Sequence, residues 1–283
     1  MSDKISTKKR TNEIIKKYNL KIKKSYGQNF IIEPTIVEKI ARLSYAENAV
    51  IEIGPGIGAL TEQLCLVSKK VIAYEIDKKL INVLKDTLSN YENVEIINED
   101  FLNINIVEIS ENLKKEYGSV VICANLPYYV TTPILFRIFE SESCIDYITV
   151  MIQKEVAQRF NAKPSSSDYN ALSVITQYLY ETKIIMNVSN NVFNPKPKVD
   201  SAVIQFKKKQ LEDNINRKEF FEFIKGCFKQ RRKTLHNNLK EFIFDKEIID
   251  NIYLKGNIDK NIRAQQLSLE EFINIFKIYE GLL

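Results

Sequence analysis

The sequence is poor in the residues that build metal sites and disulfide frameworks. Its 283 residues include no tryptophan, a single histidine (His236) and four cysteines, at positions 65, 123, 144 and 227. The cysteines form no C-x-x-C pair, and their density is far below that of disulfide-stapled secreted domains. A lone histidine also argues against a His-rich metal centre. We therefore expect neither a disulfide framework nor a metal site.

Long apolar runs and an apolar signal region are absent as well. No run approaches the roughly 20 residues that span a bilayer, and the first residues are charged and polar. We therefore expect a cytoplasmic protein with no membrane partner. A chain of 283 residues, of which 45% are hydrophobic, can bury the core of one large domain or of two smaller ones.

Glycine is scarce, yet three of the eight glycines stand in one turn. Gly54, Gly56 and Gly58 follow the apolar run 49–53 and precede apolar residues at helical spacing. Glycine permits positive φ and close approach of a ligand to the backbone, and a helix N-terminus offers free N–H groups. Glu75 comes 21 residues after Gly54, where a carboxylate can accept both ribose hydroxyls. The pattern predicts a nucleoside-containing cofactor, either a dinucleotide or S-adenosylmethionine.

Strand-length apolar runs alternate with helical patterns along the first part of the chain. They predict strands at 49–53, 71–74, 94–97, 120–124 and 145–152, with two more at 183–189 and 201–206. This alternation indicates a doubly wound α/β sheet, in which ligands bind outside the carboxyl ends of the strands. Glu75, Asp100 and Asn125 end three successive strands, so we expect them at one edge of the sheet.

From residue 207 onward the pattern is helical only. Helices are predicted at about 217–229, 231–243, 246–254 and 268–278, which places a domain boundary near 207–212. The sequence thus divides into a basic N-terminal extension (1–24), an α/β domain (25–207) and a small helical domain (208–283).

The segment Asn125-Leu126-Pro127-Tyr128 favours S-adenosylmethionine over a dinucleotide. An adenine 6-amino group is a poor nucleophile because its lone pair is delocalised into the ring. Acceptors at the Asn125 side chain and the Leu126 carbonyl can hold both amino hydrogens and turn the lone pair out of conjugation. Pro127 fixes the backbone, and Tyr128 can stack on the base. Hydride transfer has no use for this arrangement, whereas in-line methyl transfer depends on such alignment.

A target base must leave its stack to reach such a site. Flipped bases are commonly held between two aromatic faces, and Phe193, in the rigid segment Phe193-Asn194-Pro195-Lys196-Pro197, is the candidate for the second face. The alternative is that Phe193 is a core aromatic at the edge of a loop.

Positive charge gathers at the two ends of the chain. Residues 1–28 carry nine basic and two acidic side chains and residues 207–283 sixteen and twelve, while residues 29–206 carry sixteen and twenty-two. The basic ends predict contact with a polyanion; solvated lysine-rich helices are the alternative. Within the C-terminal end, a helix would align the basic residues for a phosphate backbone; they are Lys225, Lys229, Arg231, Arg232 and Lys233.

Taken together, these stretches resemble the bacterial small-subunit (16S) rRNA adenine dimethyltransferase family. The resemblance runs from about residue 22 to residue 280. Its motifs, in order, are K-S-Y-G-Q-N-F at 24–30, E-I-G-P-G-I-G-A-L-T at 52–61, A-N-L-P-Y at 124–128, M-I-Q-K-E-V-A at 151–157, F-N-P-K-P-K-V-D-S at 193–201, Q-R-R-K-T-L at 230–235 and R-A-Q-Q-L-S at 263–268.

The resemblance implies an S-adenosylmethionine-dependent enzyme that dimethylates two adjacent adenosines near the 3′ end of 16S rRNA. It implies a mostly parallel, seven-stranded methyltransferase sheet followed by a helical RNA-binding domain. It also implies a monomer that acts on the small ribosomal subunit or its precursor. The cofactor contacts would be Asn29, Ile31, Gly54, Gly56, Glu75, Asp100 and Asn125.

Two relatives of this function stay open as alternatives. The large-subunit rRNA methyltransferases of macrolide resistance share the fold, but their loop typically reads Asn-Ile-Pro-Tyr, whereas residue 126 here is leucine. A non-catalytic ribosome assembly factor is the other, and the intact Asn125 loop argues against a loss of catalysis.

Overall fold

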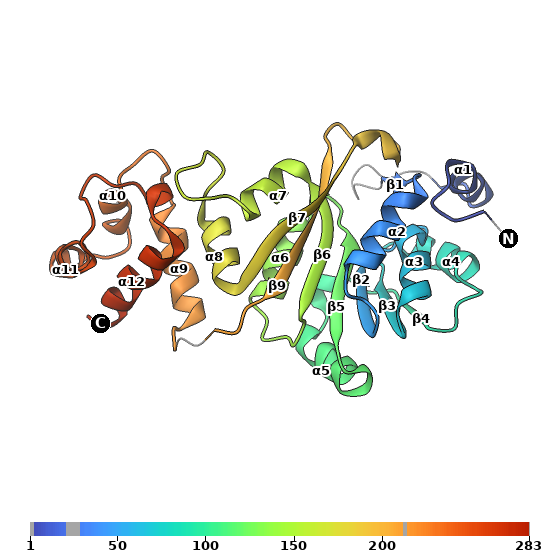
Figure 1. The fold of residues 1–283 in the computed structure, drawn as a ribbon, viewed down its shortest axis with the longest axis horizontal. Helices are drawn as coiled ribbons and strands as arrows, with labels where there is room; N and C mark the ends of the chain where they lie inside the picture. The colour runs from blue at the N-terminus through green and yellow to red at the C-terminus, as the bar shows by residue number, and fades with distance from the viewer. Residues whose placement is uncertain (1–2, 21–28, 212–213, 283) are drawn as a thin grey trace. The chain divides into compact units, whose positions relative to one another are not determined.

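The structure is a computed structural model and describes residues 3–20, 29–211 and 214–282 (Figure 1). Its packing divides the chain into two compact units. Unit 1 comprises Met1–Ala157 and Lys183–Lys208, and unit 2 comprises Gln158–Thr182 and Lys209–Leu283. Positions 21–28, which include the end of the predicted N-terminal extension and the start of the K-S-Y-G-Q-N-F motif, lie outside the described residues.

A seven-stranded sheet organises unit 1, with the strand order β4-β3-β2-β5-β6-β9-β7. β2 pairs in parallel with β3 and β5, β3 with β4, and β5 with β6, whereas β9 runs antiparallel to β6. The predicted doubly wound, mostly parallel sheet is confirmed, and each predicted strand is present with ends shifted by at most a few residues. The strands are β2 (Ala49–Ile53), β3 (Lys70–Tyr74), β4 (Val94–Ile97), β5 (Val120–Asn125), β6 (Tyr147–Gln153), β7 (Tyr180–Val188) and β9 (Ser201–Lys208).

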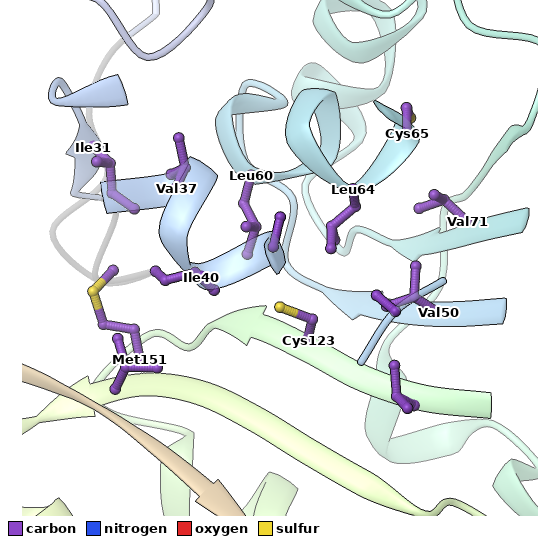
Figure 2. Packing of buried hydrophobic residues seen from close by; sticks show 14 of the residues in the cluster. Ile31, Val37, Ile40, Val50, Leu60, Leu64, Cys65, Val71, Cys123 and Met151 are labelled. Atoms are coloured by element: carbon purple, nitrogen blue, oxygen red, sulfur yellow. The ribbon is translucent and has the colours of Figure 1, made fainter. Parts of the chain in front are cut away.

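Helices cover both faces of this sheet. On one face, α2 (Pro34–Leu43) and α3 (Ala59–Val67) contribute Ile40 and Leu64, which pack over Val50 of β2 and Cys123 of β5 (Figure 2). Side chains alternate along a strand, so neighbours such as Ile51 face the other way, and α5 (Ile106–Tyr117) contacts β5 and β2. All five residues of β2 are buried, as expected for a parallel strand covered on both sides.

The remaining elements of unit 1 connect these layers. A two-stranded antiparallel ribbon, which the sequence did not predict, pairs β1 (Phe30–Ile31) with β8 (Phe193–Asn194). The other elements are α4 (Lys78–Thr87), α6 (Thr131–Phe139) and the short 3-10 helices η2 (Phe101–Asn103) and η3 (Asn190–Val192), and α7 (Lys154–Phe160) begins in unit 1 and ends in unit 2. Among the described residues, no helix is both long enough and apolar enough to cross a membrane.

The N-terminal segment is part of the unit 1 core. α1 (Lys8–Lys17) begins at Thr7, whose side chain accepts the backbone N–H of Arg10. Ile5 and Ile14 are 3% and 2% exposed and belong to the same buried cluster as Ile57, which follows the glycine turn. Apolar anchoring, and not only charge, therefore explains why this basic segment has a defined structure.

Unit 2 is built around aromatic side chains. Phe220 of α9 lies with ring centroids 4.7 Å from Tyr178 of α8 and 5.2 Å from Phe276 of α12. The packing thus groups residues 158–182 with the C-terminal helices, whereas the sequence predicted one division near residue 207. The helices of unit 2 are α8 (Ala171–Leu179), α9 (Arg217–Cys227), α10 (Leu235–Leu239), α11 (Lys246–Gly256), η4 (Ala264–Gln266) and α12 (Leu269–Glu280).

The helix predicted at 231–243 is present but shorter, because α10 covers only Leu235–Leu239. α9 ends at Cys227, and helical structure resumes only in α10 after Thr234, whose side chain accepts the N–H of Asn237 and caps the new helix. The intervening turn is closed by Asn238, which is 1% exposed and bonds both the N–H and the carbonyl of Gln230. Side-chain capping and a buried amide therefore outweigh helix propensity in this stretch.

Candidate functional site

A cavity of about 320 Å³ opens in unit 1 around the carboxyl ends of β2, β3 and β5. Its volume lies in the range of small-molecule and cofactor sites. All the residues that the sequence assigned to catalysis or to the cofactor line it, and they come from six separate segments of the chain. They are Asn29, Ile31, Gly54, Gly56, Glu75, Asp100, Asn125, Leu126, Pro127, Tyr128 and Phe193.

The glycine turn forms one wall of the cavity. Gly54, Gly56 and Gly58 have φ angles of +67°, +63° and +95°, which residues with a side chain rarely adopt. The Gly54 N–H donates to the carbonyl of Tyr74 at 2.9 Å, so the turn is tied to the end of β3. The sequence pattern thus marks a backbone surface that a ligand can approach closely.

Glu75 braces this turn from the neighbouring strand. Its carboxylate accepts the N–H of Gly56 at 3.2 Å and the N–H of Asp77 at 2.8 Å, one on each oxygen. Burial raises the pKa of Glu75 above its usual range, and these two backbone N–H groups oppose the shift. Each carboxylate oxygen keeps a further acceptor position, so Glu75 can hold the turn and still accept ligand hydroxyls.

Two further predicted contacts are placed by local structure. Asp100 caps η2 because its Oδ1 accepts the N–H of Leu102 at 3.0 Å. Ile31 stands opposite Phe193 in the β1–β8 pair. This small ribbon, which joins positions more than 160 residues apart, brings the N-terminal motif and the Phe193 segment to the same cavity.

The Asn125 loop is held by hydrogen bonds on both sides. Asn125 ends β5 opposite Met151 of β6, and the Leu126 N–H donates to the Met151 carbonyl at 3.1 Å. The Pro127 carbonyl accepts the side-chain hydroxyl of Thr131 at 3.0 Å, in the first turn of α6. The loop is thus fixed between two elements, which is the condition for aligning acceptors on an amine.

The two aromatic candidates differ in their surroundings. Tyr128 is half-buried, and its hydroxyl pairs with the Ser201 hydroxyl at 2.8 Å. Phe193 is 4% exposed and belongs to the buried cluster that contains Ile31 and Val37. Phe193 is therefore a core aromatic that also lines the cavity, and its contact with a flipped base stays a prediction.

Sequence reasoning assigned no role to Glu52, Ile76 or Tyr129, which also line the cavity. Ile76 and Tyr129 are 48% and 56% exposed, and each directly follows a predicted site residue. Glu52 is 1% exposed, and burial raises its pKa to about 8. A glutamate inside an otherwise apolar strand, two residues before Gly54, was the available signal for Glu52.

The cavity is acidic. Glu52, Glu75, Glu99 and Asp100 line it, and no lysine, arginine or histidine stands among its described lining residues. Like charges at short range repel in a partly buried site. This lining suits a cationic ligand and is unfavourable for the two negative charges of a dinucleotide pyrophosphate.

The five basic residues of the C-terminal region lie in unit 2 and do not share a helical face. Only Lys225 is in α9, because that helix ends at Cys227. Lys229 and Lys233 each form an ion pair with Glu241, at 3.1 and 3.5 Å. Arg231 donates to the Ser167 carbonyl and to Gln265, whereas Arg232 is exposed. Helical alignment is thus excluded, and RNA binding by these residues stays a prediction.

The chain is similar to known proteins along nearly its whole length. The model of the family described as "Ribosomal RNA adenine dimethylase" matches residues 19–281. "Ribosomal RNA small subunit methyltransferase A" of Bacillus cytotoxicus is 46% identical over 278 residues, which cover 95% of this chain and 94% of that protein. The protein of the same name from Clostridioides difficile is 44% identical over 276 residues, with 95% of each chain covered.

Solved structures agree with these matches. A dimethyladenosine transferase from Plasmodium falciparum superimposes with a TM-score of 0.77 at 25% identity and covers 89% of this chain and 97% of its own. The 23S rRNA methyltransferase ErmE has the same fold, with a TM-score of 0.68 at 23% identity, over 89% of this chain and 100% of its own. With the family model matching 19–281, the chain belongs to the ribosomal RNA adenine dimethylase family.

Proposed function

We propose that this protein transfers methyl groups from S-adenosylmethionine to the 6-amino groups of two adjacent adenosines near the 3′ end of 16S rRNA. Its substrate is the small ribosomal subunit or its precursor, on which it acts as a monomer in the cytoplasm. Relatives at 46% and 44% identity are named as small-subunit rRNA methyltransferases, and these names support the choice of subunit.

The cofactor assignment rests on the chemistry of the cavity wall. S-adenosylmethionine supplies an electrophilic methyl group on a sulfonium cation, and an acidic lining favours a cation. Glu75 would accept the ribose hydroxyls, and Asp100 the adenine amine. Asn29, Ile31, Gly54 and Gly56 would line the rest of the cofactor site.

Asn125 and Leu126 would orient the nucleophile. The Asn125 side-chain oxygen and the Leu126 carbonyl accept the two amino hydrogens of the target adenine, which directs the nitrogen lone pair toward the methyl group. Tyr128 and Phe193 would hold the flipped base, and Pro127 keeps the backbone of the loop in place. Once the methyl group is transferred, the amine proton must leave to solvent.

The observation that carries this proposal is the convergence at one cavity. Glu75, Asp100 and Asn125, each at or just beyond the end of a different parallel strand, meet the glycine turn there. A dinucleotide-dependent oxidoreductase would share the turn, but it would have no use for an Asn-Leu-Pro-Tyr loop at the same opening.

Primer extension on rRNA from a deletion strain tests the proposal. The strain should lack the modification stops near the 3′ end of 16S rRNA, and the wild-type gene should restore them. Asn125→Ala should not restore them, although its purified protein should still bind cofactor at least in part. Asn48→Ala is a matched control, because Asn48 bonds Ser119 at the opposite ends of β2 and β5.

Four outcomes would redirect the proposal. Stops that persist in the deletion strain would remove the assigned function, and stops missing instead from large-subunit rRNA would favour the macrolide-resistance type of enzyme. Full modification by Asn125→Ala would show that the loop does not orient the amine. Normal subunit assembly with Asn125→Ala, but not in the deletion strain, would add a non-catalytic role.

A further inference from the structure

The helix α1 carries more positive charge than its own stability explains. Five of its ten residues are basic, and only Glu13 is acidic. Its first turn holds Lys8, Lys9 and Arg10 and no acid, although the positive end of the helix dipole lies there and disfavours cations. Helix stability would favour acids in this turn. Basic residues at this end of α1 therefore point to a negatively charged partner.

Two of these basic residues share a face of α1 with an asparagine. Lys8, Asn12 and Lys16 follow one another at intervals of four residues, so they lie on one side of the helix, and all three are exposed. Lys9 and Lys17 are each paired with a carboxylate, at 3.1 and 2.7 Å. Among the residues that the structure describes, neither Lys8 nor Lys16 forms an ion pair. Their charges are therefore available to a partner.

Asn12 places this face beside the cavity. Its side-chain oxygen accepts an amide N–H of Asn194 at 2.9 Å, and Asn194 directly follows Phe193 of the cavity wall. Asn194 also pairs with Phe30 in the β1–β8 ribbon, and Phe30 lines the cavity and shares a buried cluster with Ile14 of α1. α1 is thus fixed on the side of the cavity that is proposed to hold the flipped base.

The cavity itself offers no positive charge to the phosphates of a nucleotide. Acidic residues line it, and its described lining includes no lysine or arginine. A flipped adenosine stays joined to the RNA backbone, whose phosphates are repelled by carboxylates. Cations just outside the cavity offset this repulsion and hold the strand.

We propose that the exposed face of α1, which carries Lys8, Asn12 and Lys16, binds the phosphate backbone of the rRNA next to the target adenosine. The proposal rests on the proposed function, since it takes rRNA with a flipped adenine as the substrate. α1 ends at Lys17, before the match to the family model begins at residue 19. The contact thus adds to what the family model describes: α1 positions the strand, and the groups that line the cavity act on the base.

The salt dependence of binding to small ribosomal subunits tests this surface. Unmethylated subunits purified from the deletion strain are the probe, and the full-length protein is used throughout. Lys8→Ala and Lys16→Ala together should lower the slope of the logarithm of the binding constant against that of the salt concentration by up to about 1.4–1.8, which is two phosphate contacts. At about 0.15 M salt this corresponds to binding weakened roughly 10- to 30-fold. Cofactor affinity should be unchanged, because neither lysine lines the cavity.

Lys69→Ala and Lys115→Ala together are the matched control. Both lysines are exposed residues of unit 1, and they remove the same two positive charges. Lys69 directly precedes β3, and Lys115 lies near the end of α5, which leads into β5. They therefore stand at the edge of the sheet opposite to the cavity, and their loss should leave the salt slope nearly unchanged.

Lys8→Glu separates RNA binding from folding. The helix dipole favours an acid in the first turn, so this variant should resist thermal unfolding at least as well as the wild type. It should nevertheless bind the subunits more weakly than Lys8→Ala does, because it sets a negative charge beside the phosphates. If stability and affinity instead fall together in Lys8→Glu, α1 is a structural element only.

The possible failures are distinguishable. If the variant that lacks Lys8 and Lys16 binds and methylates the subunits with an unchanged salt slope, the inference about α1 is wrong and the proposed function survives. An equal loss in the control variant would show an effect of net charge alone and would also overturn the inference. If the wild-type protein neither binds nor methylates small subunits, the proposed function falls and this inference falls with it.

Discussion

Glu75 offers the sharpest test of the cofactor site, because one side chain is assigned both a binding role and a bracing role. In Glu75→Ala the cofactor loses the acceptor of its two ribose hydroxyls. A charge-assisted pair of hydrogen bonds is worth about 2–3 kcal/mol, which corresponds to binding weakened about 30- to 140-fold. The same substitution leaves the N–H groups of Gly56 and Asp77 without their acceptor.

The two roles separate in the assay. Titration calorimetry with S-adenosylmethionine measures binding, and thermal unfolding of the free protein measures the bracing of the turn. Asp77→Asn is the control, because Asp77 is 7% exposed and caps α4 through the N–H of Lys79 without lining the cavity. Asparagine is an equally good cap, so this variant should bind the cofactor within about twofold of the wild type, as expected for a change away from the ligand.

The result that would refute the ribose assignment is equally specific. If Glu75→Ala folds and binds S-adenosylmethionine as the wild type does, the carboxylate accepts nothing from the ligand. If Glu75→Ala lowers the melting temperature and leaves the affinity of the remaining folded protein unchanged, Glu75 is a brace only.

Three further predictions concern stability and the substrate. Because the pKa of Glu52 is raised to about 8 in the folded protein, its proton stabilises the fold, and this stability is lost as pH rises from about 4.5 through 8. The free energy of unfolding of Glu52→Gln relative to that of the wild type should therefore increase as pH rises through that window, by at most about 5 kcal/mol. If the stabilities of the two proteins instead change in parallel with pH, Glu52 is not a buried carboxylic acid in the folded protein. Ile14→Ala should cost about 2–5 kcal/mol of stability, and Ile15→Ala, at a half-buried position of the same helix, should cost less; equal small losses in chemical denaturation would show that the N-terminal helix is not anchored. Changing Arg231, Arg232 and Lys233 of the basic turn together to alanine should weaken rRNA binding without changing cofactor affinity. The slope of the binding constant against salt concentration should fall by up to about 0.7–0.9 log unit for each phosphate that is no longer neutralised. An unchanged slope would show that these residues form only a solvated surface. Because Arg231 bonds Gln265 within unit 2, Arg232→Ala is the cleaner single probe of RNA binding by this turn.

The local parts of the architecture followed from the sequence alone. Strand-length apolar runs predicted every strand of the seven-stranded sheet. The signal is most complete for β2, because a parallel strand that is covered on both faces is apolar along nearly its whole length. Three glycines in five residues predicted the turn, because its backbone adopts positive φ at each of them. The rule that ligands bind at the carboxyl ends of parallel strands then brought Glu75, Asp100 and Asn125 to one edge.

Only the tertiary structure decided what these residues contact across the chain. No local pattern pairs Ile31 with Phe193, binds Lys229 and Lys233 to Glu241, or groups residues 158–182 with the C-terminal helices. The same holds for Glu52, whose position in the sequence marks it as unusual, while its burial and its unpaired oxygen depend on α3 and β5 packing around it. Periodicity and turn chemistry act between near neighbours, whereas burial, and with it the pKa of a carboxyl group, is set by segments distant in the sequence.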